Sequence, residues 1–225
     1  DEAGTAITTG DYNTALGYAT ALALTTGQQN TALGSQALAS ATTADYNTAV
    51  GQNSMQANTT GANNVSVGAY ALDANTTGAS NVALGSSSLS ANTTASNNTA
   101  VGYVAMTANT TGTQNAAVGS YSLDANTTGG NNAAFGHAAL NSNTTASFNA
   151  SFGAGSMATN TTGANNTGLG YNALAANTTA SNNTAVGYAS LTANTTGAGN
   201  VAVGFQAADA ITGGSDNVSV GLAAL

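Results

Sequence analysis

The stretch "NTAVGYASLTANTTGAG", from Asn183 to Gly199, is one copy of a unit that fills the chain. Asparagine recurs every 17 residues without a slip, at 13, 30, 47, 64, 81, 98, 115, 132, 149, 166, 183, 200 and 217. We number each unit from this asparagine, so Asn183 is at position 1 and Gly199 at position 17. A large apolar residue stands at position 4 and glycine at position 5 in all thirteen units, and position 9 is Leu or Met in eleven.

So short a unit, with so few large apolar residues, does not bury a core alone and must stack on its neighbours. Helical repeats usually need about 30 residues or more, and the glycine and the many β-branched residues disfavour a helix. The repeat therefore predicts an all-β fold, a parallel β-solenoid of about thirteen 17-residue coils. We expect one domain over residues 1–225, with a partial coil at 1–12, twelve full coils over 13–216 and a partial coil at 217–225.

The core is predicted from the alternation of side chains along a strand, which puts positions 2 and 4 on one face. We expect that face inside, so that Val201 and Val203 point inward and Ala202 points outward. The small residues at position 3 then form a smooth outer face, and a corner at the glycine turns the leucine at position 9 inward. The predicted core ladder contains Val50, Val67, Leu84, Val101, Val118, Phe135 and Phe152 at position 4, and Leu72, Leu89, Leu123, Leu140, Leu174 and Leu191 at position 9.

Asparagine also forms a second column at position 12 of the nine central coils. Stacked amides donate to one neighbour and accept from the other, which fixes the register between coils. This predicted Asn ladder contains Asn58, Asn75, Asn92, Asn109, Asn126, Asn143, Asn160, Asn177 and Asn194.

Charge and composition exclude several classes of partner. The chain has no Lys, Arg, Pro, Cys or Trp and a net charge of −8. Binding to nucleic acid or to anionic lipid needs cations that neutralise phosphates, so neither partner is expected. No apolar run approaches the roughly 18 residues of a membrane span, so no membrane insertion is expected.

The segments "NVAVGFQAADA", "NVSVGAYALDA" and "NTAVGYASLTA" carry a family resemblance. They resemble the head repeats of YadA-type trimeric autotransporter adhesins, with about three extra residues per unit, and similar repeats occur in bacterial surface and phage fibre proteins. The resemblance covers the whole chain, and Val201 to Gly204 match the family's inner strand and glycine. It implies a parallel β-roll in an extracellular, cell-surface or virion fibre. The expected partners are copies of this chain, joined head-to-tail and bundled laterally or as trimers.

We expect no enzyme, because a catalytic site needs unlike groups that converge and this chain scarcely breaks its repeat. His137 has no unusual acid or nucleophile beside it in the pattern, and Asp73 and Asp124 are three coils apart. No two candidate ligands cluster within the repeat, so no metal and no cofactor are expected.

Two other roles remain open at the level of sequence. The abundant threonines are typical of an ice-binding β-solenoid, although the doublet at positions 13 and 14 puts adjacent hydroxyls on opposite faces. Asn-Thr-Thr is a glycosylation sequon nine times over, and an acidic residue precedes it at Asn75 and Asn126. An internal Asn ladder explains the same asparagines without a sugar.

The incomplete end coils give the expected mode of assembly. The C-terminal half coil of one copy is predicted to be completed by the N-terminal segment of the next, by parallel strand addition. The predicted joint contains Thr5, Ala6, Ile7, Val218, Val220, Leu222 and Leu225. The main hypothesis is thus a structural subunit of an extracellular filament that assembles head-to-tail and resists proteases. The alternatives are a segment of a trimeric adhesin or phage tail fibre, and an ice-binding solenoid.

Overall fold

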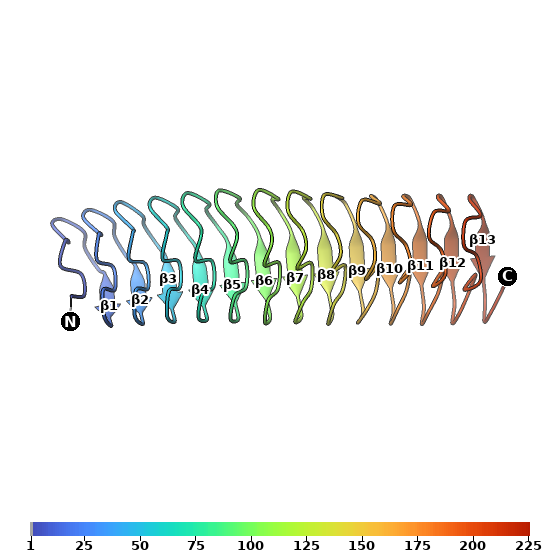
Figure 1. The fold of residues 1–225 in the computed structure, drawn as a ribbon, viewed down its shortest axis with the longest axis horizontal. Coiled ribbons are helices and arrows are strands. Elements are labelled where there is room, and N and C mark those ends of the chain that lie inside the picture. The colour runs from blue at the N-terminus through green and yellow to red at the C-terminus, as the bar shows by residue number, and fades with distance from the viewer. Residues whose placement is uncertain (1) are drawn as a thin grey trace. The chain divides into compact units, whose positions relative to one another are not determined.

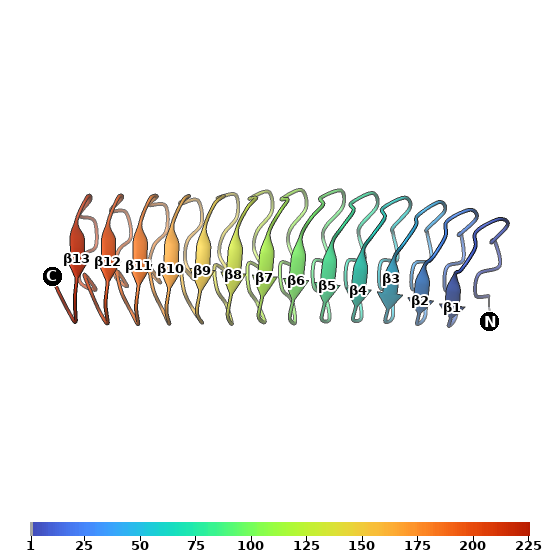
Figure 2. The ribbon, with the colours of Figure 1, turned by 180° about the vertical axis from the view of Figure 1, so that it is seen from behind.

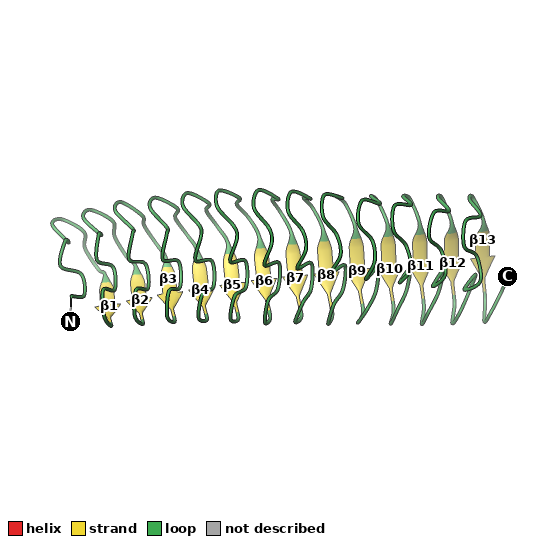
Figure 3. Ribbon diagram, viewed as in Figure 1, coloured by secondary structure: helices red, strands yellow, loops and turns green. Residues whose placement is uncertain are grey.

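The computed structural model describes residues 2–225. Over this part of the chain it contains thirteen short parallel strands and no helix, in a β-solenoid of about 12 turns of ~17 residues (Figure 3). The predicted fold class is confirmed. The chain divides into two compact units, Asp1–Thr113 and Gln114–Leu225.

Each strand occupies positions 2 to 4 of a coil. In the first unit the strands are β1 (Thr14–Leu16), β2 (Thr31–Leu33), β3 (Thr48–Val50), β4 (Val65–Val67), β5 (Val82–Leu84) and β6 (Thr99–Val101). In the second unit they are β7 (Ala116–Val118), β8 (Ala133–Phe135), β9 (Ala150–Phe152), β10 (Thr167–Leu169), β11 (Thr184–Val186), β12 (Val201–Val203) and β13 (Val218–Val220).

Within each unit the strands follow one another in sequence order, as the two opposite views show (Figures 1 and 2). Each residue of a strand lies beside the residue 17 positions later, as Thr48 lies beside Val65. Backbone hydrogen bonds between coils also form outside the strands: the amide of Met55 donates to Ala71 at 3.0 Å, and that of Thr59 to Thr76 at 2.9 Å. Adjacent coils are therefore joined at several points around the turn, although each strand is three residues long.

The strands face the opposite way from the predicted orientation. Position 3 is buried in the coils, as at Ala185 and Ala202, whereas positions 2 and 4 lie outside. The prediction that Val201 and Val203 point inward is wrong. The same correction applies to the half-buried or exposed position-4 residues Val50, Val67, Leu84, Val101, Val118, Phe135 and Phe152.

The reason for this orientation is the width of the coil. Gly168 stands at position 3, and a Cβ placed there would lie 2.6 Å from Oγ of Ser156 and 3.3 Å from Cγ of Met157, at positions 8 and 9 of the preceding coil. Since the Leu or Met side chain fills the interior opposite the strand, only Ala, Ser or Gly has room at position 3. Leu72 and Leu89 in the first unit are fully buried, and so are Leu123, Leu140, Leu174 and Leu191 in the second.

The glycine at position 5 is fixed by conformation and by close approach. Gly51 has φ +130°, and a Cβ on it would lie 2.6 Å from the carbonyl oxygen of Gly68 in the next coil. An L residue rarely adopts this conformation and has no room here. The strand therefore ends at the residue before this glycine in each described coil.

Three further corners have positive φ in residues other than glycine, at positions 7, 9 and 17. Leu72 at position 9 has φ +52°, and Asn63 at position 17 has φ +59°. An L residue in this left-handed region costs roughly 1–2 kcal/mol, so the fold maintains these corners through the contacts of the stacked coils.

Candidate functional site

The predicted Asn ladder is confirmed as a chain of side-chain hydrogen bonds in each unit. In the first unit Nδ2 of Asn75 donates to Oδ1 of Asn58 at 2.8 Å, and Asn92 donates to Asn75 at 2.9 Å. In the second unit Asn143 donates to Asn126, Asn160 to Asn143, Asn177 to Asn160 and Asn194 to Asn177, over 2.7–3.3 Å. The ladder asparagines are fully buried.

The asparagines at position 1 form a second ladder of a different kind. Oδ1 of Asn166 accepts the backbone amide of Asn183, the position-1 residue of the next coil, at 2.9 Å. Nδ2 of Asn166 donates to the carbonyl of Ala180, 14 residues later, at 2.8 Å. Each such side chain therefore joins the two ends of its own coil and also holds the following coil.

The two columns meet at the carbonyl of position 15. The carbonyl oxygen of Gly61 accepts Nδ2 of Asn47 at 2.9 Å and Nδ2 of Asn58 at 3.0 Å. In the second unit Gly163 accepts from Asn149 and Asn160 in the same way. We call this arrangement the amide clamp. The sequence shows both asparagine columns but not that they share an acceptor.

The ladder of the second unit ends where the repeat changes. Oδ1 of Asn194 is buried without a hydrogen-bond partner, because the next coil has Ile211 at position 12 in place of a donor. The unpaired oxygen of Asn194 shows that each bond of the ladder needs an asparagine in the following coil.

Burial corrects the glycosylation hypothesis for Asn75 and Asn126. Both side chains are fully buried. Nδ2 of Asn75 already donates to Asn58 and to the carbonyl of Gly78, the latter at 3.0 Å. A sugar on either amide nitrogen is incompatible with the described fold, since there is no space for it.

The outer face of the strands is an uncharged surface in both units. We call positions 2 and 4 of the coils the strand face; it carries Thr, Val or Ala at position 2 and Val, Leu or Phe at position 4. Val67 is 39 % exposed and Leu169 48 % exposed. Phe135 and Phe152 stack on this face with ring centroids 4.8 Å apart. No acidic residue stands at either position.

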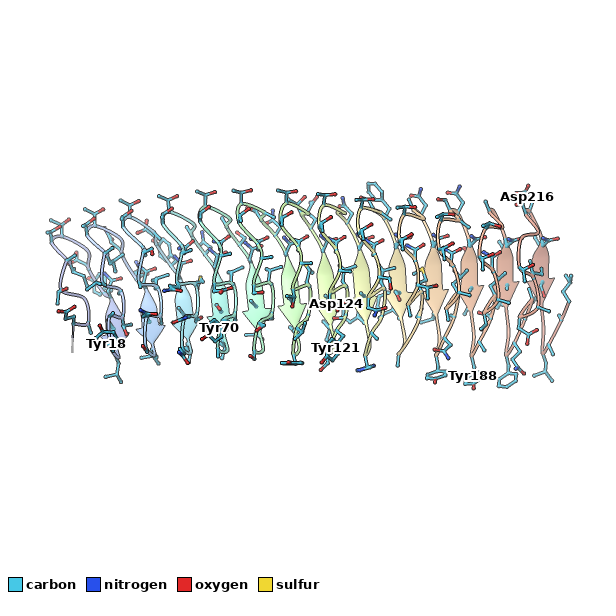
Figure 4. The ribbon with its side chains drawn as sticks, viewed as in Figure 1. Tyr18, Tyr70, Tyr121, Asp124, Tyr188 and Asp216 are labelled. Atoms are coloured by element: carbon cyan, nitrogen blue, oxygen red, sulfur yellow. The ribbon has the colours of Figure 1, made fainter. Side chains whose placement is uncertain are left out.

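A second exposed stack of aromatic rings lies at position 6 of successive coils in the second unit. The rings of Tyr171 and Tyr188 are stacked at 5.4 Å, and those of Tyr188 and Phe205 at 5.0 Å. Tyr188 lies at the lower edge in Figure 4, while Asp216 at position 17 lies at the upper edge. His137 occupies the same position 6 and meets Tyr121 edge to face, with centroids 6.0 Å apart.

The threonine doublet divides into an internal and an external column. The position-13 hydroxyls are partly buried and donate to the carbonyl of the next coil, as Thr59 does to Thr76 at 2.9 Å. The position-14 threonines, such as Thr77 and Thr179, are exposed. An ice-binding array built on the doublet thus has one exposed hydroxyl column.

Acidic side chains do not gather into a site in the described part of the chain. Asp73 and Asp124 are half-buried at position 10, one in each unit. Desolvation by burial raises the pKa of both carboxyl groups, against the opposing effect of backbone amides at Asp73, Ala74, Asp124 and Ala125. No group of three or more His, Cys, Asp or Glu residues suited to a metal ion occurs among residues 2–225.

A hollow of about 330 Å³ in the first coil is lined by Ala3, Ala15, Leu16, Gly17 and Tyr18. None of these five described lining residues carries a charge. In the described residues, no helix is long and apolar enough to cross a membrane.

The predicted joint residues are distributed over both units. Thr5, Ala6 and Ile7 belong to the first unit, and Val218, Val220, Leu222 and Leu225 to the second. The latter four are 68–78 % exposed. The head-to-tail contact stays a prediction.

Comparison with known proteins gives no match to a family model, to a curated protein or to a solved structure.

Proposed function

We propose that this chain is a structural stretch of an extracellular or virion fibre, and that the repeat itself is the functional feature. The observation that carries the proposal is the amide clamp. Two buried asparagines in each central coil donate to one carbonyl, and both columns continue from coil to coil within each unit. Buried polar side chains that satisfy one another stabilise a rigid, specific arrangement and leave no group for a ligand.

In this proposal the chain is not an enzyme. His137, whose ring meets that of Tyr121, has no acidic or nucleophilic residue beside it that departs from the repeat pattern. A catalytic site needs a nucleophile, a base and a stabilising group within reach of one reacting atom. The arrangement of the described coils supports a mechanical role in place of such a site.

A segment of a trimeric adhesin or phage fibre is the second candidate, and the strand face is the observation that favours it. This face is half-buried to exposed along the coils and free of charge. Since all charged residues of the chain are acidic, a charged face would repel its own copy, whereas the strand faces of two or three copies can pack without repulsion.

Electron microscopy and mass measurement of the purified full chain test these alternatives. Filaments much longer than one chain support head-to-tail assembly, and a closed trimer supports the adhesin-like arrangement. Separate monomers at micromolar concentration contradict both modes of assembly. Inhibition of ice growth by such monomers would instead favour the ice-binding alternative.

A pair of matched variants locates the contact. We expect V67E and L169E, which put a carboxylate on the strand face of each unit, to dissociate lateral assemblies. T77E and T179E add the same charge on the exposed threonine column and serve as controls. Equal loss of assembly in both pairs would contradict a role for the strand face.

A further inference from the structure

The corner at position 17 carries a second set of glycosylation sequons, different from Asn-Thr-Thr. Five described coils have asparagine at this corner: Asn63, Asn97, Asn131, Asn165 and Asn182. In three of them threonine follows two residues later, at position 2 of the next coil, which completes the acceptor motif Asn-x-Thr. These three are Asn97 with Thr99, Asn165 with Thr167, and Asn182 with Thr184.

We propose that Asn97, Asn165 and Asn182 are acceptor sites for N-linked sugar on the folded chain, and that the nine Asn-Thr-Thr asparagines are not. The three corner side chains are exposed, whereas the nine others are fully buried in the ladder. Asp216, at the same corner position, lies at the upper edge of its coil in Figure 4.

The backbone at the corner presents the side chain without needing it for the fold. Asn97 has φ +63° and Asn182 φ +64°, the left-handed conformation that asparagine tolerates well. Their backbone amides donate to Ala79 and Ala164, each at 3.1 Å, so the corner is held by main-chain bonds. Glycine occupies the same corner in a later coil, at Gly199, so the corner forms without a side chain. A sugar on the corner amide therefore replaces no bond on which the coil depends.

Three other sequons in the chain are excluded by their bonds. Asn149 begins Asn-Ala-Ser but is buried, and its Nδ2 donates to Gly163 at 3.0 Å. Asn64 begins Asn-Val-Ser but is fully buried, and its Nδ2 donates to Gly78 at 2.9 Å. Asn217 begins Asn-Val-Ser, and its Nδ2 donates to Oδ1 of Asn200 at 2.9 Å.

The chemistry is glycosyl transfer from a nucleotide sugar. Nδ2 of the asparagine attacks the anomeric carbon of UDP-glucose, and the bond from that carbon to the phosphate oxygen breaks. UDP leaves with the bonding electrons, and the amide proton passes to a base of the transferase. One N-glycosidic bond forms for each UDP released.

The test incubates the folded full chain with a sequon-specific N-glycosyltransferase and UDP-glucose, and maps hexoses by mass spectrometry of peptides. We expect one hexose each at Asn97, Asn165 and Asn182, and none at Asn-Thr-Thr. Circular dichroism before and after the reaction verifies that the chain stays folded. Synthetic peptides spanning 57–62 and 95–100 are positive controls, because both sequons are accessible in a short peptide.

The chain offers its own matched variants, since position 2 varies naturally between threonine and valine. T99V should remove the hexose at Asn97 alone, and V65T should create a new acceptor at Asn63. Neither change introduces a residue that is foreign to this strand position. Hexoses on the Asn-Thr-Thr asparagines of the folded chain would overturn the proposal, and so would unmodified corners when both peptides react.

Discussion

The carbonyl oxygen at position 15 links the two asparagine columns, so replacing a single asparagine weakens the contacts that hold a coil together. It accepts two side-chain amides, one from each asparagine column, as at Gly163. Both donors are buried, so neither finds water if its partner is removed. The free energy of unfolding lost on replacing either asparagine therefore includes the cost of the buried polar atom left without a partner as well as that of the lost hydrogen bond.

We expect Asn177→Ala to lower the free energy of unfolding by about 1–3 kcal/mol, because it leaves Oδ1 of Asn160 buried without its donor. Alanine itself fits at this position, as Ala41 shows in an earlier coil. Urea denaturation measures the difference. Thr179→Ala, at an exposed site in the same coil, is the control and should change stability by less than about 0.5 kcal/mol. Equal effects of the two variants would contradict the role of the ladder.

Asp73 and Asp124 give the fold a dependence on pH. Burial raises the pKa of both carboxyl groups, so the folded chain binds these protons more tightly than the unfolded chain. At pH values below the unfolded-state pKa, these groups do not change the free energy of unfolding. As the pH rises from the unfolded-state pKa through the folded-state pKa, they lower the free energy of unfolding increasingly.

The double variant D73N/D124N should therefore be more stable than the parent at pH 7, with the gain disappearing near pH 3. Asn141 already occupies this position in the coil after Asp124, so the amide fits the space there, with its Oδ1 buried and without a hydrogen-bond partner. Thermal unfolding at the two pH values measures the effect. A gain of the same size at both pH values would show that the charge is not its cause.

At the scale of the strand and its corner, the sequence predicts the period and the register but not the direction of the side chains. The unbroken 17-residue spacing leads to parallel stacking, and the asparagine columns lead to the ladder. The reversed strand could have been recognised at position 3, where Ala, Ser and Gly alone occur. The restriction of position 3 to small residues indicates a lack of space inside the coil, beside the Leu or Met side chain of position 9.

The left-handed corners are a second feature that sequence reasoning misses. Glycine is the usual signal for positive φ, yet Leu140 and Tyr121 adopt it here. A weaker signal was available, because positions 7, 9 and 17 nearly avoid β-branched residues. Among the described residues with positive φ, Val104 is the single β-branched one. Stacking between coils overrides the local preference, and no single unit contains that information.

The two glycine positions of a coil should respond differently to alanine. Gly51→Ala places a side chain at φ +130° against the backbone of the next coil, so we expect a loss of about 1–3 kcal/mol or more. A Cβ on Gly61, at position 15, would also meet a backbone oxygen, that of Gly78, but Gly61 does not have a left-handed φ. Gly61→Ala should therefore cost less, since Ala44 and Ala95 occupy that position in other coils. Melting temperatures of the two variants test the contrast. A larger loss for Gly61→Ala would contradict the assignment of the corner to position 5.

At the scale of the whole molecule, the charge is of one sign. The chain has eight acidic residues and no Lys or Arg, so no attraction to a basic side chain offsets the repulsion among its carboxylates. In most proteins added salt weakens favourable pairs as well as unfavourable ones. Here screening by salt acts on repulsion, because the Debye length falls from about 30 Å at 0.01 M to about 10 Å at 0.1 M.

Sodium chloride should therefore raise the melting temperature of the full chain at pH 7 between these two concentrations. The gain in free energy should be small, less than about 1 kcal/mol, because the charges are dispersed along the chain and the described ones are at least partly exposed to water. Carboxyl groups in general lose their charge when the pH falls below a pKa of about 4, so the same addition of salt should have almost no effect near pH 2.5. Measurement at both pH values separates charge screening from general effects of the salt on apolar burial. A melting temperature that falls with salt at pH 7 would mean that the carboxylates make favourable interactions in the folded chain, in conflict with the one-signed charge.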